Sequence, residues 1–532
     1  MALLGPALLT PAAHALQAPP VPARAPAYLA PAFRSALEVP LPALRRETLP
    51  AAVPADGTSP DPSGRIGFHS DAGRVSTDPR TGNGFFRSLG ANGRSCGTCH
   101  QPSQGMGLSA AAARRRFDLF GAGGDPLFAP VDGADCPNRV PPSEIRSSRP
   151  PAGRQQPAHD SAGARSLLLR YGLFRVFLPV PAGADYTLSI APRDDPTTCN
   201  TDPAYARDPA DSATRIVSVY RRPLISANLA FATETEFPPA DSAQTSGNIM
   251  WDGREPTLAS QVVDATLVHA QRDTRPPPAG QGPLTREDPV VRGIVAFETG
   301  FFSAQQVSGT AGPLTDGGAK GGARNLRSAV ARGVLPGFTP TFDEYDAWAD
   351  PPGSPPTVAA RRSIRRGQDL FTGRNRRGRF TIADVPGFSD FPGVPNPAPG
   401  QTCTVCHNAR HGGSDALPNS QRNIGTTGDT AKGRPLRRDL PVFTVACTGP
   451  DNPFLGRSFE TNDPGLALIS GKCADAGKVT VPQLRALAAR APYFHDGSAR
   501  TLLDVVDFYA RRFSIRLTDQ DKRDLASFLG AL

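Results

Sequence analysis

Two copies of the pattern Cys-x-x-Cys-His constrain this chain more than any other feature of its sequence. The first is Cys96-Gly-Thr-Cys99-His100 and the second is Cys403-Thr-Val-Cys406-His407. With 8 Cys and 8 His among 532 residues, about 0.002 such patterns are expected by chance. In this spacing both thiols can bond the vinyl groups of a haem, and the adjacent His can bind its iron. The sequence therefore predicts two covalently attached c-type haems, with His100 and His407 as proximal iron ligands.

Two other interpretations fit the pattern less well. The paired cysteine motifs of a zinc site normally lie about 12–20 residues apart, whereas these two motifs occur near opposite ends of the chain. A redox-active Cys-x-x-Cys pair would not explain why His follows both times.

Four further cysteines lie outside the motifs, at Cys136, Cys199, Cys447 and Cys473. Haem c is attached on the oxidising side of the membrane, where spare cysteines tend to form disulfides. The simplest assignment is one disulfide in each half of the chain, Cys136–Cys199 and Cys447–Cys473. Three pairings are possible and the sequence does not choose among them. Buried free thiols are the alternative.

The length of the chain suggests several units rather than one core. Residues 1–15 are uncharged and apolar and end in Ala13-His14-Ala15, which predicts a secretory signal segment. Residues 16–61 are rich in Ala and Pro and are predicted to be a linker. Residues 62–308 and 357–532 are then an N-terminal and a C-terminal haem domain. Residues 309–356 connect the two.

The fold class is predicted to be mainly α with extensive loops, as two cytochrome c-like haem domains in tandem with long insertions. The 58 Pro and 53 Gly indicate many turns but stay below the roughly 25–30% typical of low-complexity disorder. Residues 359–371 are predicted to form the helix that opens the second domain. Thr518 and Asp521 predict a capping box for a closing helix with Leu525 and Phe528 on one face.

Composition narrows the partners and the compartment. No internal run of about 20 apolar residues is present, so no membrane span is expected. The net charge is +9, but no nucleic-acid-binding module accompanies the basic residues, so nucleic acid is not an expected partner. The arginine-rich runs at 114–116 and 361–379 are expected to be solvated, or to contact haem propionates or an acidic electron donor. The signal segment and the haems together predict a periplasmic or secreted protein.

Two further motifs resemble those of a known family. Trp251-Asp252-Gly253-Arg254 lies between the haem motifs, and Ala491-Pro492-Tyr493-Phe494-His495-Asp496-Gly497-Ser498 follows the second. In this order, the four motifs resemble those of the bacterial di-haem cytochrome c peroxidases over residues 80–532, with insertions. The resemblance implies that hydrogen peroxide is reduced at the N-terminal haem. It also implies that the C-terminal haem accepts electrons from a small cytochrome or cupredoxin.

The same resemblance assigns roles to individual residues and suggests further partners. Trp251 would be the bridge between the two haems, and Arg254 of the same motif joins it among the candidate catalytic residues. The family also has a calcium ion between its domains, although its ligands do not align onto this sequence. Many of its members are homodimers.

The chain departs from that family around the N-terminal haem. The peroxidases bind this iron with a distal His, whereas the corresponding residues 217–228 contain none. His269 is the alternative, either in the distal pocket as an iron ligand or outside it. Gln271 falls where the peroxidases place a catalytic Glu, and an amide can hydrogen-bond but cannot carry a proton. His269 titrates in the useful range and can replace that Glu as proton carrier.

A second departure concerns the C-terminal haem. The peroxidases have a distal Met here, but no Met follows Met250, and Tyr509 occupies the equivalent position. Thr501 and Asp504 predict a capped helix that directs Tyr509 inward, either as an iron ligand or as a packed core residue. A Tyr ligand lowers the potential of the iron. This position resembles the di-haem enzyme that matures the tryptophan tryptophylquinone cofactor of methylamine dehydrogenase.

Three functional hypotheses follow from the sequence. The first is a di-haem c-type oxidoreductase of the peroxidase kind, which the motif around Trp251 and the long insertions favour. The second is a non-catalytic electron carrier with both irons six-coordinate, which the loss of the catalytic Glu and of the distal Met favours. The third is a di-haem oxidase or oxygenase that acts on an organic or protein substrate. Motifs alone do not choose among them, because activity depends on the site.

Overall fold

The structure is a computed structural model, and it describes residues 50–141, 144, 158–208, 211–233, 245–272, 284–331, 342–383, 385, 397–409, 412–415, 420–428 and 433–532. The predicted signal segment and most of the predicted linker lie outside these residues.

Helices occur along the whole described chain, and most are short. They are α1 (Cys96–Cys99), α2 (Ala110–Gly124), α3 (Pro130–Gly133), α5 (Ala158–Gly163), α6 (Ser166–Tyr171), α7 (Pro203–Ala206), α8 (Leu229–Thr233), α9 (Leu258–Val268), α10 (Pro289–Thr299), α11 (Ala323–Ala331), α12 (Pro355–Phe371), α13 (Ala467–Ser470), α14 (Leu502–Arg512) and α15 (Asp519–Gly530).

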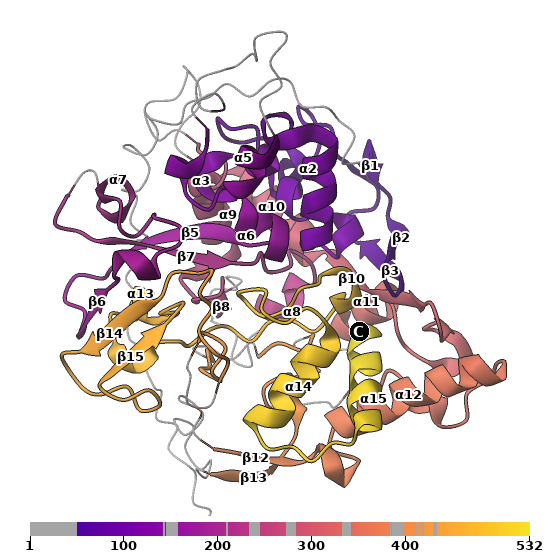
Figure 1. The fold of residues 1–532 in the computed structure, drawn as a ribbon. Helices are drawn as coiled ribbons and strands as arrows, with labels where there is room; N and C mark the ends of the chain where they lie inside the picture. The colour runs from indigo at the N-terminus through magenta and orange to yellow at the C-terminus, as the bar shows by residue number, and fades with distance from the viewer. Residues whose placement is uncertain are drawn as a thin grey trace, which may run out of the picture.

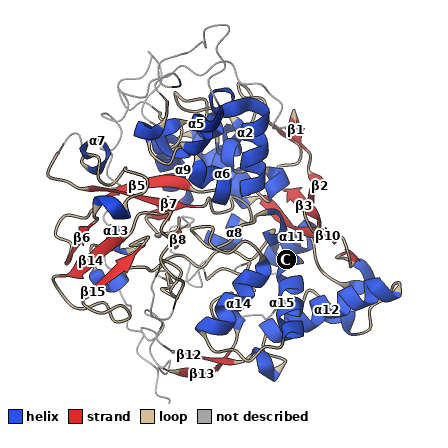
Figure 2. Ribbon diagram, viewed as in Figure 1, coloured by secondary structure: helices blue, strands red, loops and turns tan. Residues whose placement is uncertain are grey.

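Strands are equally dispersed among the loops (Figure 2). They are β1 (Ala52–Val53), β2 (Asp56–Asp61), β3 (Gly64–Ser70), β4 (Val75–Ser76), β5 (Phe174–Pro179), β6 (Tyr186–Ser189), β7 (Ile216–Arg221), β8 (Thr245–Ile249), β9 (Glu255–Thr257), β10 (Phe301–Ser308), β11 (Gly312–Pro313), β12 (Phe380–Ile382), β13 (Ala398–Gln401), β14 (Phe443–Cys447) and β15 (Ser458–Thr461).

The N-terminal haem motif rests on an aromatic core. An antiparallel sheet in the order β11-β10-β3-β2 forms one side of this half, and α10 leads directly into β10. Phe297 at the end of α10 packs against Phe85 and Phe301, with ring centroids 4.9 and 5.2 Å apart. The ring of Phe85 in turn lies 6.5 Å from that of His100. Buried aromatic packing therefore supports the first Cys-x-x-Cys-His segment.

The C-terminal haem motif rests on a second, separate core. Helices α12, α14 and α15 pack together (Figure 1). A Cβ on Gly367 would lie only 2.0 Å from the carbonyl oxygen of Asp524, so glycine is what lets α12 cross α15 this closely. Phe371 at the end of α12 packs on Phe528, with centroids 5.4 Å apart, and lies 6.3 Å from the His407 ring.

A sheet shared by the two halves joins them. Strand β14 pairs with β15 on one side and with β6, from the N-terminal half, on the other. Val445 of β14 lies opposite Leu188 of β6, and both are buried. Figure 1 shows these strands side by side at one edge of the molecule. The two predicted haem domains are therefore in close contact rather than loosely linked.

Two expectations about the fold need correction. Among the described residues, 37% are helical and 18% lie in strands, so the fold is mixed rather than mainly α, whereas the expected extensive loops are present. Short strands are hard to recognise in Pro- and Gly-rich segments, where few residues alternate cleanly. Residues 56–61 were assigned to the linker, but they form β2, which pairs with β3 from Asp56–His69 to Asp61–Gly64.

Several local predictions are confirmed. The helix expected over residues 359–371 exists as α12, although it begins earlier, at Pro355, with prolines in the first turn, where they are well tolerated. The capping boxes of Thr518 with Asp521 and of Thr501 with Asp504 both form.

In the described part of the chain, none of the helices has the length and apolar character that a membrane crossing requires.

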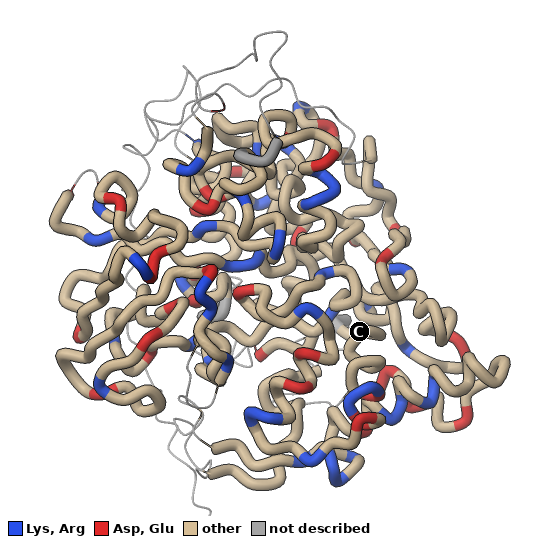
Figure 3. Tube along the Cα trace, in the orientation of Figure 1, with Lys and Arg blue, Asp and Glu red and all other residues tan. Residues whose placement is uncertain are grey.

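The arginine-rich runs are largely neutralised by carboxylates. In the run at 361–379, Arg361 pairs with Asp316 and Arg366 with Asp524, both at 2.7 Å. Blue and red segments accordingly lie side by side around α12 in Figure 3. In the other run, Arg116 forms a buried pair with Asp125. None of these arginines lines the cavities described below. The structure therefore does not support the expectation that they contact haem propionates.

Candidate haem-binding and catalytic site

The first Cys-x-x-Cys-His motif folds as the short helix α1, with His100 as its C-cap. The Nδ1 atom of His100 lies 3.0 Å from the carbonyl oxygen of Met106. When Nδ1 donates to this carbonyl, Nε2 is left unprotonated and can bind a metal. Burial lowers the pKa of His100 to about 4, although the bond to Met106 opposes the shift. The imidazole is therefore neutral, as an iron ligand has to be.

The second motif repeats this arrangement. The Nδ1 atom of His407 lies 2.8 Å from the carbonyl oxygen of Gly413, six residues further along, as in the first motif. Burial lowers the pKa of His407 to about 4. Gly413 has a φ of +92°, and a Cβ there would meet Leu484 at 2.6 Å. The turn that orients His407 therefore depends on glycine.

The eight cysteines separate into two groups. The disulfides Cys136–Cys199 and Cys447–Cys473 both form, so the simplest of the three possible pairings is confirmed. The four motif cysteines are free. Burial raises the pKa of Cys403 and Cys406 to about 12 and that of Cys99 to about 11, so these thiols stay protonated.

Each motif opens onto its own cavity. We call them the N-terminal cavity, of about 1330 Å³, lined by Cys99 and His100, and the C-terminal cavity, of about 1570 Å³, lined by Cys403, Cys406 and His407. Free thiols, a neutral His and this space together fit one haem c in each cavity.

The two cavities share one wall. We use "shared wall" for the residues that line both cavities, which are Arg222, Pro223, Leu224, Trp251, Thr480, Val481, Pro482, Gln483 and Arg490. Trp251 is buried, and its Nε1 donates to the carbonyl oxygen of Arg222 at 2.7 Å. Its ring packs edge-on against His495, with centroids 6.0 Å apart. The motif residues Trp251 and His495, remote in sequence, thus meet between the cavities.

A buried ion-pair network fixes the turn that carries Trp251. The carboxylate of Asp252 accepts from Arg254 at 2.9 Å and from Arg221 at 2.5 Å. Arg221 also donates to Asp463 at 2.7 and 2.8 Å. Burial alone would raise the pKa of Asp252, but the two arginines outweigh it and lower the pKa to about 2. Arg254 lines the N-terminal cavity, whereas Asp252 anchors the turn beneath it.

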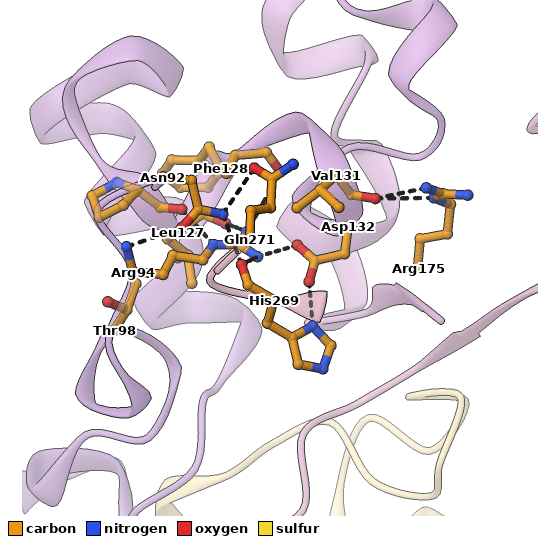
Figure 4. A network of polar contacts seen from close by, with 12 residues as sticks. Asn92, Arg94, Thr98, Leu127, Phe128, Val131, Asp132, Arg175, His269 and Gln271 are labelled. Atoms are coloured by element: carbon orange, nitrogen blue, oxygen red, sulfur yellow. Dashed lines mark hydrogen bonds and ion pairs between the residues drawn. The ribbon is translucent and has the colours of Figure 1, made fainter. Parts of the chain in front are cut away.

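His269 lies in the N-terminal cavity, at the C-terminal end of α9. It lines the cavity with Gln261 and Ala265, which lie eight and four residues earlier and so share one helix face. Its Nδ1 is 2.5 Å from Asp132, which also pairs with Arg94 (Figure 4). Burial would raise the pKa of Asp132, but Arg94 and His269 lower it. The ionised carboxylate therefore holds the His269 ring with Nε2 free.

Gln271 lies near His269 but not in the cavity. The Oε1 atom of Gln271 accepts a hydrogen bond from Asn92 Nδ2 at 3.2 Å. The side-chain amide of Asn92 also donates to the carbonyl oxygen of His269, at 2.7 Å. In Figure 4 the Gln271 amide lies above the network and the His269 ring below it. Gln271 does not line either haem cavity. Its φ of +55° turns the chain away after α9.

Tyr509 faces the proximal ligand of the C-terminal cavity. It lies on α14 and lines this cavity, and its hydroxyl oxygen is 3.4 Å from His407 Nε2. Burial raises the pKa of Tyr509 above its usual value, and the neighbouring Cys406 and Cys403 act in the same direction. The capped start of α14 at Thr501 sets the helix phase that directs Tyr509 inward.

Comparison with characterised proteins is consistent with this geometry. The chain is 31% identical over 137 residues to the cytochrome-c peroxidase IdrP2 of Denitromonas iodatirespirans, a match to 24% of this chain and 35% of that protein. It is 36% identical over 81 residues to the cytochrome-c peroxidase IdrP1 of Pseudomonas sp. (strain SCT), a match to 13% of this chain and 21% of that protein. The chain is a distant homologue of the bacterial di-haem cytochrome-c peroxidases.

The similarity to these peroxidases is partial. The matched segments span about a third and a fifth of the two curated peroxidases. No protein-family model matches the chain. Among solved structures, a MauG-like protein associated with microbial copper homeostasis aligns over 58% of this chain and 82% of its own, with 17% identity and a TM-score of 0.28. Homology to di-haem peroxidases implies haem c as the cofactor.

Several residues of the site were not recognised from the sequence. Asp132 lies 38 residues from Arg94 and 137 from His269, so no local pattern connects the three. Glu298 lines a smaller cavity of about 600 Å³ beside Cys96. Burial raises the pKa of Glu298 to about 8, although a bond from Ser226 opposes this, and its Oε2 has no partner. Glu298 is the one carboxylate in the apolar helix α10, and this was the feature by which the sequence could have pointed to it.

The calcium ion implied by the family resemblance is not shown. In the ranges that the structure describes, no cluster of three or more His, Cys, Asp or Glu side chains could hold a metal ion.

Proposed function

We propose that the chain is a periplasmic di-haem c-type oxidoreductase that reduces hydrogen peroxide in the N-terminal cavity. Electrons come from a small cytochrome or cupredoxin through the C-terminal cavity. The observation that carries this proposal is the shared wall, because two cavities, each lined by a Cys-x-x-Cys-His motif, meet at Trp251. Haem c in each cavity would supply the redox-active iron that the side chains lack.

In the N-terminal cavity, His269 is the proton carrier. Its Nε2 faces the cavity while the buried carboxylate of Asp132 holds Nδ1 and so fixes the orientation of the ring. Gln271 does not carry the proton, because a neutral amide can donate and accept hydrogen bonds but does not ionise near neutral pH. Gln271 instead fixes Asn92, which in turn holds the His269 backbone. The role of the family's Glu is thereby transferred from position 271 to His269.

In the C-terminal cavity, His407 and Tyr509 would hold the haem iron between them, because the Tyr509 hydroxyl oxygen lies 3.4 Å from His407 Nε2. A tyrosine oxygen ligand would favour the ferric state and give this haem a low potential. Such a haem would be suited to hold oxidising equivalents next to Trp251.

Two disulfides support a location outside the cytoplasm. Together with the apolar residues 1–15, they favour the periplasm. A homodimer remains part of the proposal through the family resemblance.

Peroxide turnover by the purified holoprotein with a reduced donor cytochrome tests the proposed activity. We expect rapid, peroxide-dependent oxidation of the donor in a stopped-flow spectrometer, with a transient change in the haem absorbance. Haem spectra that peroxide leaves unchanged, with the donor still reduced after one-electron pre-reduction of the protein, would contradict it.

An electron carrier is the second candidate, and the position of the Gln271 amide outside both cavities favours it. The ferric absorption spectrum distinguishes the two. A high-spin charge-transfer band indicates an open iron, which a peroxidase needs at its N-terminal haem. Two low-spin haems would indicate that His269 is an iron ligand and that the protein transfers electrons only.

A further inference from the structure

The shared wall contains two buried arginines that lack a carboxylate partner among the described residues, although the charge of Asp496 acts on Arg222 without forming an ion pair. Within the described ranges, neither Arg222 nor Arg490 forms an ion pair. Arg222 donates from Nη2 to the carbonyl oxygen of Leu108 at 2.6 Å, and its Nε has no partner. Arg490 donates only to backbone carbonyls, those of Ala486, Gln483 and Arg485.

The neighbouring Arg221 shows how ion pairs neutralise a buried arginine in this protein. Arg221 is equally buried but is bound by Asp252 and Asp463, whose charges raise its pKa despite burial. In Arg222, burial and the nearby charge of Arg490 lower the pKa to about 9. Burial likewise lowers the pKa of Arg490 to about 10. A buried cation without a counter-ion is costly, so these two side chains are suited to an anion that arrives with a ligand.

We propose that Arg222 and Arg490 form a carboxylate clamp that binds propionates of both haems across the shared wall. This rests on the proposed binding of a haem in each cavity. Guanidinium groups bind carboxylates through two parallel hydrogen bonds. On a haem, the propionates lie on the edge opposite the vinyl groups that join the cysteines. The shared wall fits this orientation, because none of the motif cysteines belongs to it.

The clamp is also connected to the bridge between the cavities. The carbonyl oxygen of Arg222 accepts from Trp251, and the Arg222 amide donates to the His495 carbonyl oxygen at 2.7 Å. Because Arg222 and Arg490 line both cavities, each positive charge acts on both irons. Positive charge near an iron disfavours its ferric state and raises its potential. The clamp therefore offsets the negative propionates at both haems together.

Midpoint potentials of the two haems in Arg490→Gln and Arg222→Gln holoproteins test this proposal. The haem content of the wild-type protein is measured first, because a wild-type protein that binds fewer than two haems would contradict the proposed function rather than the clamp. With two haems bound, we expect both potentials to fall in each variant. Arg215→Gln is the matched control, because Arg215 is largely buried, donates to the carbonyl oxygen of Leu188 and lines neither cavity.

Unchanged potentials in both variants, or a shift at only one haem, would overturn a clamp shared by the two cavities. A shift of equal size in Arg215→Gln would overturn it as well. If the Gln variants do not accumulate, Arg490→Lys and Arg222→Lys keep the charge but lose the bidentate fork. For these variants we expect smaller downward shifts at both haems, and potentials equal to wild type would contradict the clamp.

Discussion

The two cavities hold their proximal histidines alike but differ on the opposite side. Across from His407, a single hydroxyl group of Tyr509 lies 3.4 Å from the ligand nitrogen. The N-terminal cavity instead contains His269, which is held by a network of Asp132 and Arg94. One cavity thus presents a hydroxyl group opposite its motif histidine, and the other presents an imidazole held by a carboxylate. Under the proposed function, this difference would divide electron storage and peroxide chemistry between two otherwise similar sites.

Replacing His269 is expected to have the largest effect on this division. Loss of a general acid–base group costs about 10²–10⁴-fold in rate, so His269→Ala should reduce peroxide turnover by at least about a hundredfold. The C-terminal haem spectrum should not change. His69→Ala is the control, because His69 also pairs with an aspartate, Asp56, at 2.8 Å but lies outside the cavities. Turnover within a factor of two of wild type would remove His269 from the mechanism.

Asp132→Asn should have a smaller effect on the same cavity. Replacing a partner that orients a functional His costs about 10–100-fold in activity. We expect a loss of peroxide turnover in this range, with Asp56→Asn as control.

Burial opposes the ionisation of Asp132, but Arg94 and His269 hold its pKa below the usual value. Its charge therefore stabilises the fold above about pH 4 and stops doing so as the pH falls through the lower folded pKa.

The stability of Asp132→Asn should accordingly approach that of wild type only in acid. Thermal unfolding measured from about pH 2 to pH 7 checks this expectation. A stability difference that grows on acidification would contradict it.

Tyr509→Phe should affect the C-terminal cavity alone. Removing the hydroxyl should turn the ferric spectrum of this haem towards high spin and raise its potential, while peroxide turnover falls by less than about tenfold. Tyr493→Phe is the matched control, because Tyr493 lines the same cavity but donates to the carbonyl oxygen of Leu487. A spectral change at the N-terminal haem would contradict the separation of the two sites.

Glu298→Gln should change stability rather than turnover. Burial raises the pKa of Glu298 to about 8, so the folded protein favours the protonated form. Its stabilising contribution is complete below the unfolded pKa of about 4.3 and is lost as the pH rises through about 8. The variant should lose this dependence and gain on the order of a few kcal/mol relative to wild type at high pH. Glu460→Gln, on an exposed strand position, serves as control. Parallel pH profiles for Glu298→Gln and wild type would show that Glu298 is not held protonated.

Covalent and local patterns in the sequence predicted much of the site. The two Cys-x-x-Cys-His motifs fix their own geometry within six residues, and the capping pair of Thr501 and Asp504 sets the phase of α14. For that reason the cavities' proximal ligands and the inward direction of Tyr509 could be expected from sequence. The compartment predicted that the four remaining cysteines would form disulfides, but the pairing was only the simplest of three possibilities until the structure showed it.

Interactions between distant segments could not be predicted in this way. Asp132 contacts His269 across 137 residues, and β6 pairs with β14 across nearly half of the chain. Among the described residues, Arg222 has no ion-pair partner. This depends on where distant segments of the chain lie, which no local sequence pattern predicts. The sequence places Gln271 just after α9, but the direction of its side chain depends on a left-handed φ that the residue type does not suggest.

The composition of the shared wall has a consequence for the biogenesis of the protein. The wall combines residues 222–224 and 251 with residues 480–483 and 490. The first Cys-x-x-Cys-His motif is therefore synthesised long before the far side of its cavity exists. If this motif carries haem c as proposed, the haem could be attached at Cys96 and Cys99 before residues 480–490 are synthesised, whereas the cavity around it is complete only when those residues are in place. A protein truncated before residue 480 would then carry its first cofactor with one side open to water and without the environment that sets its potential.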